Sequence, residues 1–327
     1  MTNRDSVTLL FSSAGRRVAL MNNFRKAAKE LGLHVNIVAV DMDPLWSPAC
    51  EAADVAFPVP RCTAEDFMPQ MLDICRKQKV DLIIPTIDTE LMPYVEHKDM
   101  FIKIGTDIHI GDAQFVAVAR NKEETARLLQ SHNVPVPDSW DATGYMEKRE
   151  NISFPLLIKP KDGSCSKGIS LVSSTEEMQA LIEVQKDLLI QEVCKGQEYT
   201  INCFYDRNGK CVSCVPHLRK FVRDGEVCLA QTERVPAFTA IAHQFSKIFK
   251  GIWGCICFQG FKKDDGSVKI FEINARFGGG YPICDYAGGT YARWLLQDLI
   301  GVDPDYHDDW REGVRMLRYD EAFFSEN

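Results

Sequence analysis

Residues 254–280 read GCICFQGFKKDDGSVKIFEINARFGGG, and this stretch decides the fold. Residues 255–261 are apolar and β-prone, turn residues follow, and residues 268–273 return as a second strand. The Asp265-Gly266 pair is the strongest two-residue signal for a hairpin turn. We therefore expect two antiparallel strands joined by a two-residue turn.

Polar side chains alternate along the return strand. Successive side chains point to opposite faces, so Glu272, Asn274 and Arg276 should share one face, and Phe271 and Ile273 the other. A solvated surface hairpin is the plain alternative. The stretch ends in three glycines that can place backbone N–H groups against an anion, namely Gly278, Gly279 and Gly280.

A two-residue turn would also pair the strands in a useful register. Gln259 would then lie opposite Glu272, with Cβ atoms roughly 4.5–5.5 Å apart. Gln259, Glu272 and Asn274 would offer three oxygen ligands to one point. Oxygen ligands suit Mg²⁺, with Mn²⁺ as an alternative.

The run FEINARFGGG resembles the metal-binding strand of the ATP-grasp superfamily, in the branch similar to the carbamoyl-phosphate synthase large chain. In that pattern a Glu is followed by an Asn and then an Arg, with a Gln or another polar ligand on the neighbouring strand. These positions are Glu272, Asn274, Arg276 and Gln259 here. The resemblance implies ATP and Mg²⁺ as cofactors, metal ligation by Gln259, Glu272 and Asn274, and catalytic roles for Asn274 and Arg276.

Residues 1–111 alternate strand and helix signals, which predicts a parallel sheet with helices on both faces. The motif GxGxxG is absent, which argues against a nicotinamide dehydrogenase. Open sheets of this kind bind ligands at the carboxyl ends of their strands. We expect a substrate there, held by Arg16, Asp88 and Glu90 and, from the other side, by residues 278–280. Alternatively, these residues only tie two domains together.

Residues 112–327 are expected to form a two-lobed ATP-grasp module with an antiparallel sheet, so the fold class is α/β. The nucleotide lid would span about residues 122–195. Residues 112–132 read as one helix, and family members carry a basic residue near its start that reaches the nucleotide phosphates. Lys122 is the best match and Arg120 the next.

Residues 154–172, FPLLIKPKDGSCSKGISLV, read as a strand, a small-residue loop and a returning strand. Such a hairpin can fold over a triphosphate with Lys159 beneath it. It is not a Walker A loop, because the spacing differs and a strand follows. The loop resembles the ATP-grasp phosphate loop, which implies nucleotide contacts from four residues: Lys159, Ser164, Ser166 and Gly168.

Residues 191–200, QEVCKGQEYT, resemble the hinge between the two ATP-grasp lobes. By that resemblance Glu192 and the backbone of Val193 hold adenine, and Glu198 holds the ribose hydroxyls. Family members also place a basic residue near the γ-phosphate. Lys220 is our catalytic candidate, but the sequence does not decide between it and Arg219.

Composition narrows the function further. The formal net charge of −8 argues against a nucleic-acid surface. The chain has no apolar run long enough to span a bilayer and no signal-peptide segment at its start, so we expect a cytoplasmic protein without membrane partners. The twelve cysteines are scattered, and Cys211 and Cys214 read as buried strand residues rather than zinc ligands.

The sequence therefore predicts an ATP-dependent carboxylate–amine ligase. ATP would convert a small-molecule carboxylate into an acyl phosphate, and an amine would displace the phosphate. Two alternatives stay open: a carboxylate kinase of the carbamoyl-phosphate type, and a non-catalytic ATP-binding regulator. A homodimer is also left open.

Overall fold

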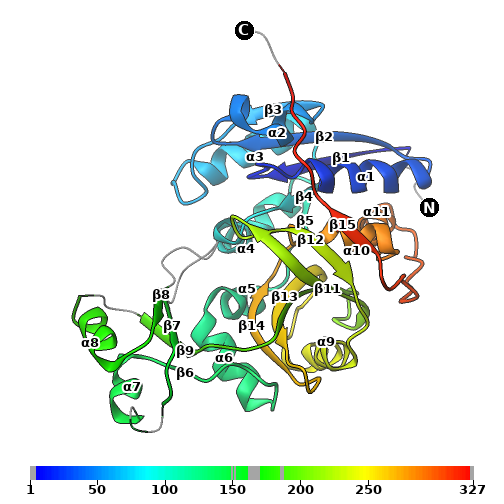
Figure 1. The fold of residues 1–327 in the computed structure, drawn as a ribbon. Coiled ribbons are helices and arrows are strands. Elements are labelled where there is room, and N and C mark those ends of the chain that lie inside the picture. The colour runs from blue at the N-terminus through cyan, green and yellow to red at the C-terminus, as the bar shows by residue number, and fades with distance from the viewer. Residues whose placement is uncertain (1–4, 149, 151, 161–169, 185–187, 325–327) are drawn as a thin grey trace.

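The computed structural model describes residues 5–148, 150, 152–160, 170–184 and 188–324, which form three sheets (Figure 1). The first is a parallel five-stranded sheet near the N-terminus. Its strand order is β3-β2-β1-β4-β5, with β1 Ser6–Ser12, β2 His34–Asp41, β3 Val55–Pro58, β4 Leu82–Pro85 and β5 Asp107–Ile108. The expected parallel α/β domain is confirmed.

Four helices and two short 3-10 turns connect these strands. They are α1 Val18–Glu30, η1 Pro44–Trp46, α2 Pro48–Glu51, α3 Phe67–Gln78, η2 Asp88–Glu90 and α4 Leu91–Ile102. The strands are apolar on both faces because both faces are covered. Leu9 and Phe11 of β1 pack in the same core as α1, whereas Leu10 packs in the same core as α3 and α4.

The second sheet has six antiparallel strands in the order β14-β13-β10-β11-β12-β15. The strands are β10 Gln197–Tyr205, β11 Cys211–Arg223, β12 Glu226–Thr232, β13 Gly254–Lys262, β14 Val268–Asn274 and β15 Arg315–Leu317. Helices α9 Pro236–Ile248, α10 Tyr281–Ala287 and α11 Tyr291–Leu299 accompany it. Cys211 and Cys214 are 2% and 1% exposed, as buried strand residues should be.

The β13–β14 hairpin reaches the expected register by another route. Its loop is longer than two residues, since Lys263 N donates to Ser267 O at 2.8 Å and Lys262 pairs with Val268. This loop alone would shift the register by one residue. A β-bulge between Gln259 and Gly260 cancels this shift, so Gln259 does pair with Glu272.

The same bulge overturns one expectation. Phe271 does not join Ile273 in the core but lines the cleft described below, where its ring lies 5.0 Å from that of Phe261. The extra residue in the bulged strand breaks the strict alternation on which the expectation rested.

The expected single helix over residues 112–132 is two helices, α5 Ala113–Arg120 and α6 Lys122–Ser131. Asn121 has extended backbone angles, and its side-chain oxygen accepts hydrogen bonds from Glu123 N and Glu124 N, each at 3.1 Å. Asn is a strong N-cap, so it ends one helix and starts the next.

The third sheet forms a separate lobe, drawn in green at the lower left of Figure 1. Its order is β6-β9-β7-β8, and its elements are β6 Ser139–Trp140, α7 Ala142–Lys148, β7 Leu156–Pro160, β8 Ser170–Val172, α8 Thr175–Val184 and β9 Leu188–Glu192. We expected a lid over about residues 122–195, but α6 packs against β14 of the large sheet, and the lobe's elements begin at Ser139.

The hydrophobic cores show which parts of the chain pack together. Two clusters each contain residues of both the N-terminal sheet and the six-stranded sheet. The four-stranded lobe has a cluster of its own, which includes Tyr145, Leu156 and Ile190. The first two sheets therefore form one packed body to which the small lobe is attached. No helix of the described ranges is long and apolar enough to cross a membrane.

A buried histidine joins the first two sheets. His109 Nε2 accepts a hydrogen bond from Cys255 N at 2.9 Å, and burial lowers the pKa of His109 to about 3, so the ring is neutral. Gly254 lies against this ring with φ +75°, and a Cβ there would sit 2.5 Å from His109 Nε2.

Gly254→Ala should lower the free energy of unfolding by about 2–4 kcal/mol, because it combines backbone strain with a clash against a buried ring. Gly266→Ala is the matched control: φ is +82°, but nothing lies within 4 Å of the added carbon. It should cost about 1–2 kcal/mol. Urea unfolding measures both, and equal losses would contradict the clash.

Candidate active site

A cleft of about 370 Å³ lies between the small lobe and the six-stranded sheet, and the N-terminal domain contributes to its lining. The residues that line it come from all three sheets. From the small lobe and the hinge they are Leu157, Lys159, Gln191, Glu192, Val193 and Cys194. The other lining residues belong to the six-stranded sheet and its turns, to the start of α6, and to the segments that follow β1, β4 and β14.

The hairpin face carries the predicted oxygen ligands. Gln259, Glu272 and Asn274 all line the cleft. The amide atom of Gln259 that faces Glu272 Oε2 lies 3.0 Å from it, and the hydrogen bonds are satisfied when that atom is the nitrogen. With the amide turned the other way, two oxygens would face each other, as in a cation site.

These residues fit a hard cation. Glu272 supplies a carboxylate and Asn274 an amide oxygen, and oxygen ligands are what Mg²⁺ binds. The described residues hold no group of three His, Cys, Asp or Glu side chains suited to a metal, so a site here must use amide oxygens. Lys122 Nζ lies 3.9 Å from Glu272 Oε1.

Arg219, not Lys220, faces the cleft. The two residues are neighbours on β11, at a point where the strand register shifts between Arg219 and Phe221. Arg219 lines the cleft and its Nε lies 2.9 Å from Glu198 Oε1, whereas Lys220 is exposed and is not among the lining residues. The geometry corrects our choice of Lys220. Burial raises the pKa of Glu198, although Arg219 acts in the opposite direction.

The hinge places Glu192 differently from the expectation. Its Oε1 accepts from Asp138 N at 3.0 Å and from Lys269 Nζ, so the side chain ties the small lobe to β14. The neighbouring Val193 also lines the cleft, and the rings of Phe261 and Phe271, tilted by 34° to each other, supply apolar surface. An aromatic wall of this kind suits a planar ring.

Two lysines lie near each other in the cleft. Lys159 is 6% exposed and donates to Gln191 Oε1 at 3.0 Å. Burial, followed by the charge of Lys122, lowers the pKa of Lys159 to about 8. Lys122 begins α6 and lines the cleft, whereas Arg120 is not among the lining residues of the described chain. Ser164, Ser166 and Gly168 lie outside the described residues.

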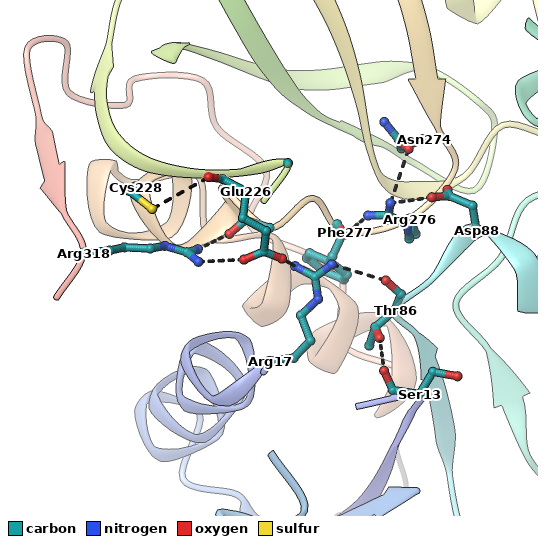
Figure 2. A network of polar contacts seen from close by, with 12 residues as sticks. Ser13, Arg17, Thr86, Asp88, Glu226, Cys228, Asn274, Arg276, Phe277 and Arg318 are labelled. Atoms are coloured by element: carbon teal, nitrogen blue, oxygen red, sulfur yellow. Dashed lines mark hydrogen bonds and ion pairs between the residues drawn. The ribbon is translucent and has the colours of Figure 1, made fainter. Parts of the chain in front are cut away.

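Figure 2 shows the polar network at the N-terminal end of the cleft. Arg276 Nη2 donates to Asp88 Oδ2 at 2.5 Å and to Asn274 Oδ1 at 3.3 Å. Burial is the largest single influence on the pKa of Arg276 and lowers it, but Asp88, Cys257 and Glu272 together outweigh burial, so the net shift is upward. The predicted Arg16 is exposed, and its neighbour Arg17 lines the cleft instead.

Glu90 does not reach the cleft, contrary to expectation. It is fully buried within the N-terminal domain and accepts four hydrogen bonds, from Ser12 Oγ, Ser13 Oγ, Thr86 N and Ile87 N. Burial raises its pKa. Glu90 therefore fixes the ends of β1 and β4, and Asp88 is the acidic residue of this turn that faces the cleft.

The three glycines line the cleft, but their backbone angles are ordinary. None of Gly278, Gly279 and Gly280 has a positive φ. They are needed because side chains approach closely: a Cβ on Gly279 would lie 2.9 Å from both Arg17 Nη1 and Glu226 Oε1. The expected contact of their backbone N–H groups with an anion stays a prediction.

Sequence reasoning missed Arg17, Glu226 and the aromatic pair of Phe261 and Phe271. The position of Arg17 directly before α1, as its N-cap, was a usable signal, because a helix start at the edge of a parallel sheet faces ligands. Glu226 is the first residue of β12, and no sequence motif marks it as a site residue.

Comparison with known proteins agrees with this architecture. Residues 119–280 match the ATP-grasp domain family, and residues 9–109 match the PylC-like N-terminal domain family. The chain therefore contains an ATP-grasp domain preceded by a PylC-like N-terminal domain.

Curated relatives match over part of their length. The D-alanine–D-alanine ligase of Ralstonia nicotianae is 29% identical over 115 residues, which are 32% of this chain and 33% of the relative. The formate-dependent phosphoribosylglycinamide formyltransferase of Ignicoccus hospitalis is 29% identical over 153 residues, 44% of this chain and 35% of the relative. The matched segment thus spans about a third of each relative.

Solved structures share the fold over almost the whole chain. The biotin carboxylase domain of Hydrogenobacter thermophilus 2-oxoglutarate carboxylase, with MgADP and bicarbonate, has a TM-score of 0.74 at 15% identity and covers 94% of this chain and 73% of that one. N5-carboxyaminoimidazole synthetase from Staphylococcus aureus, with ADP, has a TM-score of 0.71 at 15% identity over 92% and 79%.

The lowered pKa of Lys159 predicts a pH dependence. Below its pKa of about 8 the lysine is charged and ready to meet a phosphate, whereas above it the lysine must first take up a proton. ATP affinity should therefore fall between about pH 7 and pH 9. Lys159→Arg should flatten the profile, because arginine stays charged. Titration calorimetry measures this. The exposed Lys148→Arg is the control, and a flat wild-type profile would contradict the prediction.

The two basic residues of β11 should also separate by mutation. Arg219→Ala should weaken MgATP binding about tenfold or more, because a charged hydrogen-bond donor leaves the cleft. Lys220→Ala should leave binding unchanged, since the side chain points to solvent. Equilibrium dialysis with labelled ATP measures both variants, and the reverse order of effects would restore Lys220.

Proposed function

We propose that the protein is an ATP-dependent ligase that activates a small-molecule carboxylate as an acyl phosphate and joins it to an amine. The observation that carries the proposal is the single cleft in which three groups meet. It contains two lysines, an acidic and amide face on β13–β14, and the Arg276–Asp88 pair at the strand ends of the N-terminal domain.

The nucleotide would lie along the cleft from hinge to hairpin. Adenine fits between the hinge backbone at Val193 and the ring surface of Phe261 and Phe271. Because the Glu192 side chain is bound to Lys269, the hinge backbone rather than this carboxylate would hold the base. Lys159 and Lys122 would then meet the phosphates, and Glu198 the ribose.

Gln259, Glu272 and Asn274 would hold Mg²⁺, which when bound would neutralise negative charge on the phosphates. Arg276 would stabilise the transferred phosphoryl group and present its acceptor. Its guanidinium group is fixed by Asp88 and by Asn274, so it needs no reorganisation when charge develops nearby. Arg219, close to Gln259, would face the γ-phosphate.

The carboxylate and the amine would enter at the N-terminal end, where Asp88 and residues 278–280 line the cleft. Phosphoryl transfer to one carboxylate oxygen gives the acyl phosphate and ADP. Attack by the amine nitrogen on the acyl carbon then breaks the bond to the phosphate oxygen, and the nitrogen loses a proton. Holding both reactants in one cleft supplies the proximity that this step needs.

Hydroxylamine trapping tests the proposal. The full chain is incubated with MgATP, hydroxylamine and a panel of carboxylic acids. A ligase or carboxylate kinase yields a hydroxamate and an equal amount of ADP, because hydroxylamine attacks acyl phosphates. Replacing hydroxylamine by amines then separates the two activities. Tight ATP binding without ADP formation from any acid would favour a regulator and contradict the proposal.

Glu272→Gln should cut ATP turnover about a hundredfold or more, because an amide replaces the only carboxylate proposed to hold Mg²⁺. The change keeps the shape of a partly exposed side chain, so the melting temperature should stay close to that of the wild type. Asp264→Asn is the matched control, a carboxylate-to-amide change at the exposed turn of the same hairpin. Near-normal turnover in Glu272→Gln would remove the hairpin from the mechanism.

A further inference from the structure

Two arginines approach each other at the N-terminal end of the cleft. Arg17 is the N-cap of α1, Arg276 follows β14, and both line the cleft. Burial lowers the pKa of Arg17, and the positive charge of Arg276 is the next largest cause of that lowering. The two guanidinium groups therefore repel each other where little water screens them. An anion between them would remove this repulsion.

The carboxylates of the protein neutralise this end only in part. Asp88 pairs with Arg276, and Glu226 Oε1 lies 3.1 Å from Arg17 Nη1. Glu226 is shared, however, because its Oε2 accepts from Arg318 Nη1 at 2.9 Å (Figure 2). Three arginines thus face two carboxylates. Asp224, which lines the cleft, and Arg16, whose charge acts on Glu226, add one charge of each sign.

Hydrogen-bond donors also remain available here. Arg17 Nη2 donates to Thr86 O at 3.4 Å, which is long for such a bond. Arg276 Nε and His217 Nε2 are buried and have no hydrogen-bond partner within the described ranges. Gly279 keeps the space beside Arg17 and Glu226 clear, since a side chain there would touch both.

We propose that Arg17 binds a negatively charged group of the acid substrate, so that this acid carries a second anionic group besides the carboxylate presented to Arg276. Arg318 is a positioning residue: it donates to Glu226 and to Gly279 O, and Glu226 in turn holds Arg17. The inference rests on the proposed function and names its substrate class. It also gives a role to a residue outside both matched segments.

The experiment compares acids of equal carbon number with one or two carboxylates: butyrate with succinate, pentanoate with glutarate, and 2-aminobutyrate with aspartate. Binding is measured on the full chain with MgADP, as the shift in melting temperature. Turnover is measured with MgATP and hydroxylamine. At least one doubly charged acid should stabilise the protein more than its partner and have a KM lower by about tenfold to a hundredfold.

Arg17→Ala should abolish this preference and leave the KM for ATP unchanged. Arg17→Gln keeps most of the stem if the alanine variant folds poorly, and Arg17→Lys should restore part of the preference. Inorganic phosphate offers the same oxyanion chemistry and is titrated alone with MgADP. It should stabilise the wild type and Arg17→Ala equally, because Arg276 is sufficient to bind it. A phosphate shift lost in Arg17→Ala, without any preference among the acids, would assign Arg17 to phosphate and overturn the inference.

Arg318→Ala should raise the KM of the preferred acid severalfold with little change in kcat, and Arg318→Lys should recover part of it. Arg223→Ala is the matched control, because Arg223 is an exposed arginine at the end of β11 and pairs with Asp320. A merely structural role of Arg318 would change kcat and the KM for ATP as well, and would overturn its positioning role.

The results separate this inference from the function on which it rests. If singly and doubly charged acids stabilise the protein and turn over equally well, the ligase stands and the inference is overturned. If no acid yields a hydroxamate but a doubly charged acid still stabilises the protein through Arg17, the ligase is contradicted and the anion site stands. If no doubly charged acid is preferred in either assay, the inference fails.

Discussion

The ion pair between Arg276 and Asp88 joins the end of β14 to the strand ends of the N-terminal domain. Both side chains are 14% exposed, so the pair lies where desolvation is costly and where removing one partner costs about 3–5 kcal/mol. The pair places a guanidinium group at the junction of the cleft with the N-terminal crevice. Hydrophobic cores shared by the two sheets hold this junction rigid, so the position of Arg276 depends little on the small lobe.

The small lobe is connected differently. It has its own hydrophobic cluster, and its described polar ties to the large sheet include the pair between Glu192 and Lys269. A lobe with a separate core can shift as a unit without breaking the core of the main body. The cleft thus lies between β13 and β14 of the main body and a small lobe that has a core of its own.

The sign of the charge alternates along the cleft. Lys159 and Lys122 lie toward the small lobe, Glu272 and Glu198 in the middle, and Arg17 and Arg276 at the N-terminal end. The C-terminal segment contributes at that end through Arg318, although it lies far from the hinge in sequence. In the proposed function the acid would therefore be bound by elements other than those that hold the nucleotide, which would allow one fold to serve different acids.

The sequence by itself determined the fold class and the oxygen face of the hairpin, because strand periodicity and turn residues act locally. It also predicted the pairing of Gln259 with Glu272. The predicted two-residue turn was wrong, but a β-bulge compensates for the longer loop and gives the predicted register. Only the tertiary structure decided between Arg219 and Lys220, replaced Arg16 by Arg17, and buried Glu90 away from the cleft. Each of these depends on which way a side chain points once distant elements pack, and a shift of one residue turns a side chain to the opposite face of a strand.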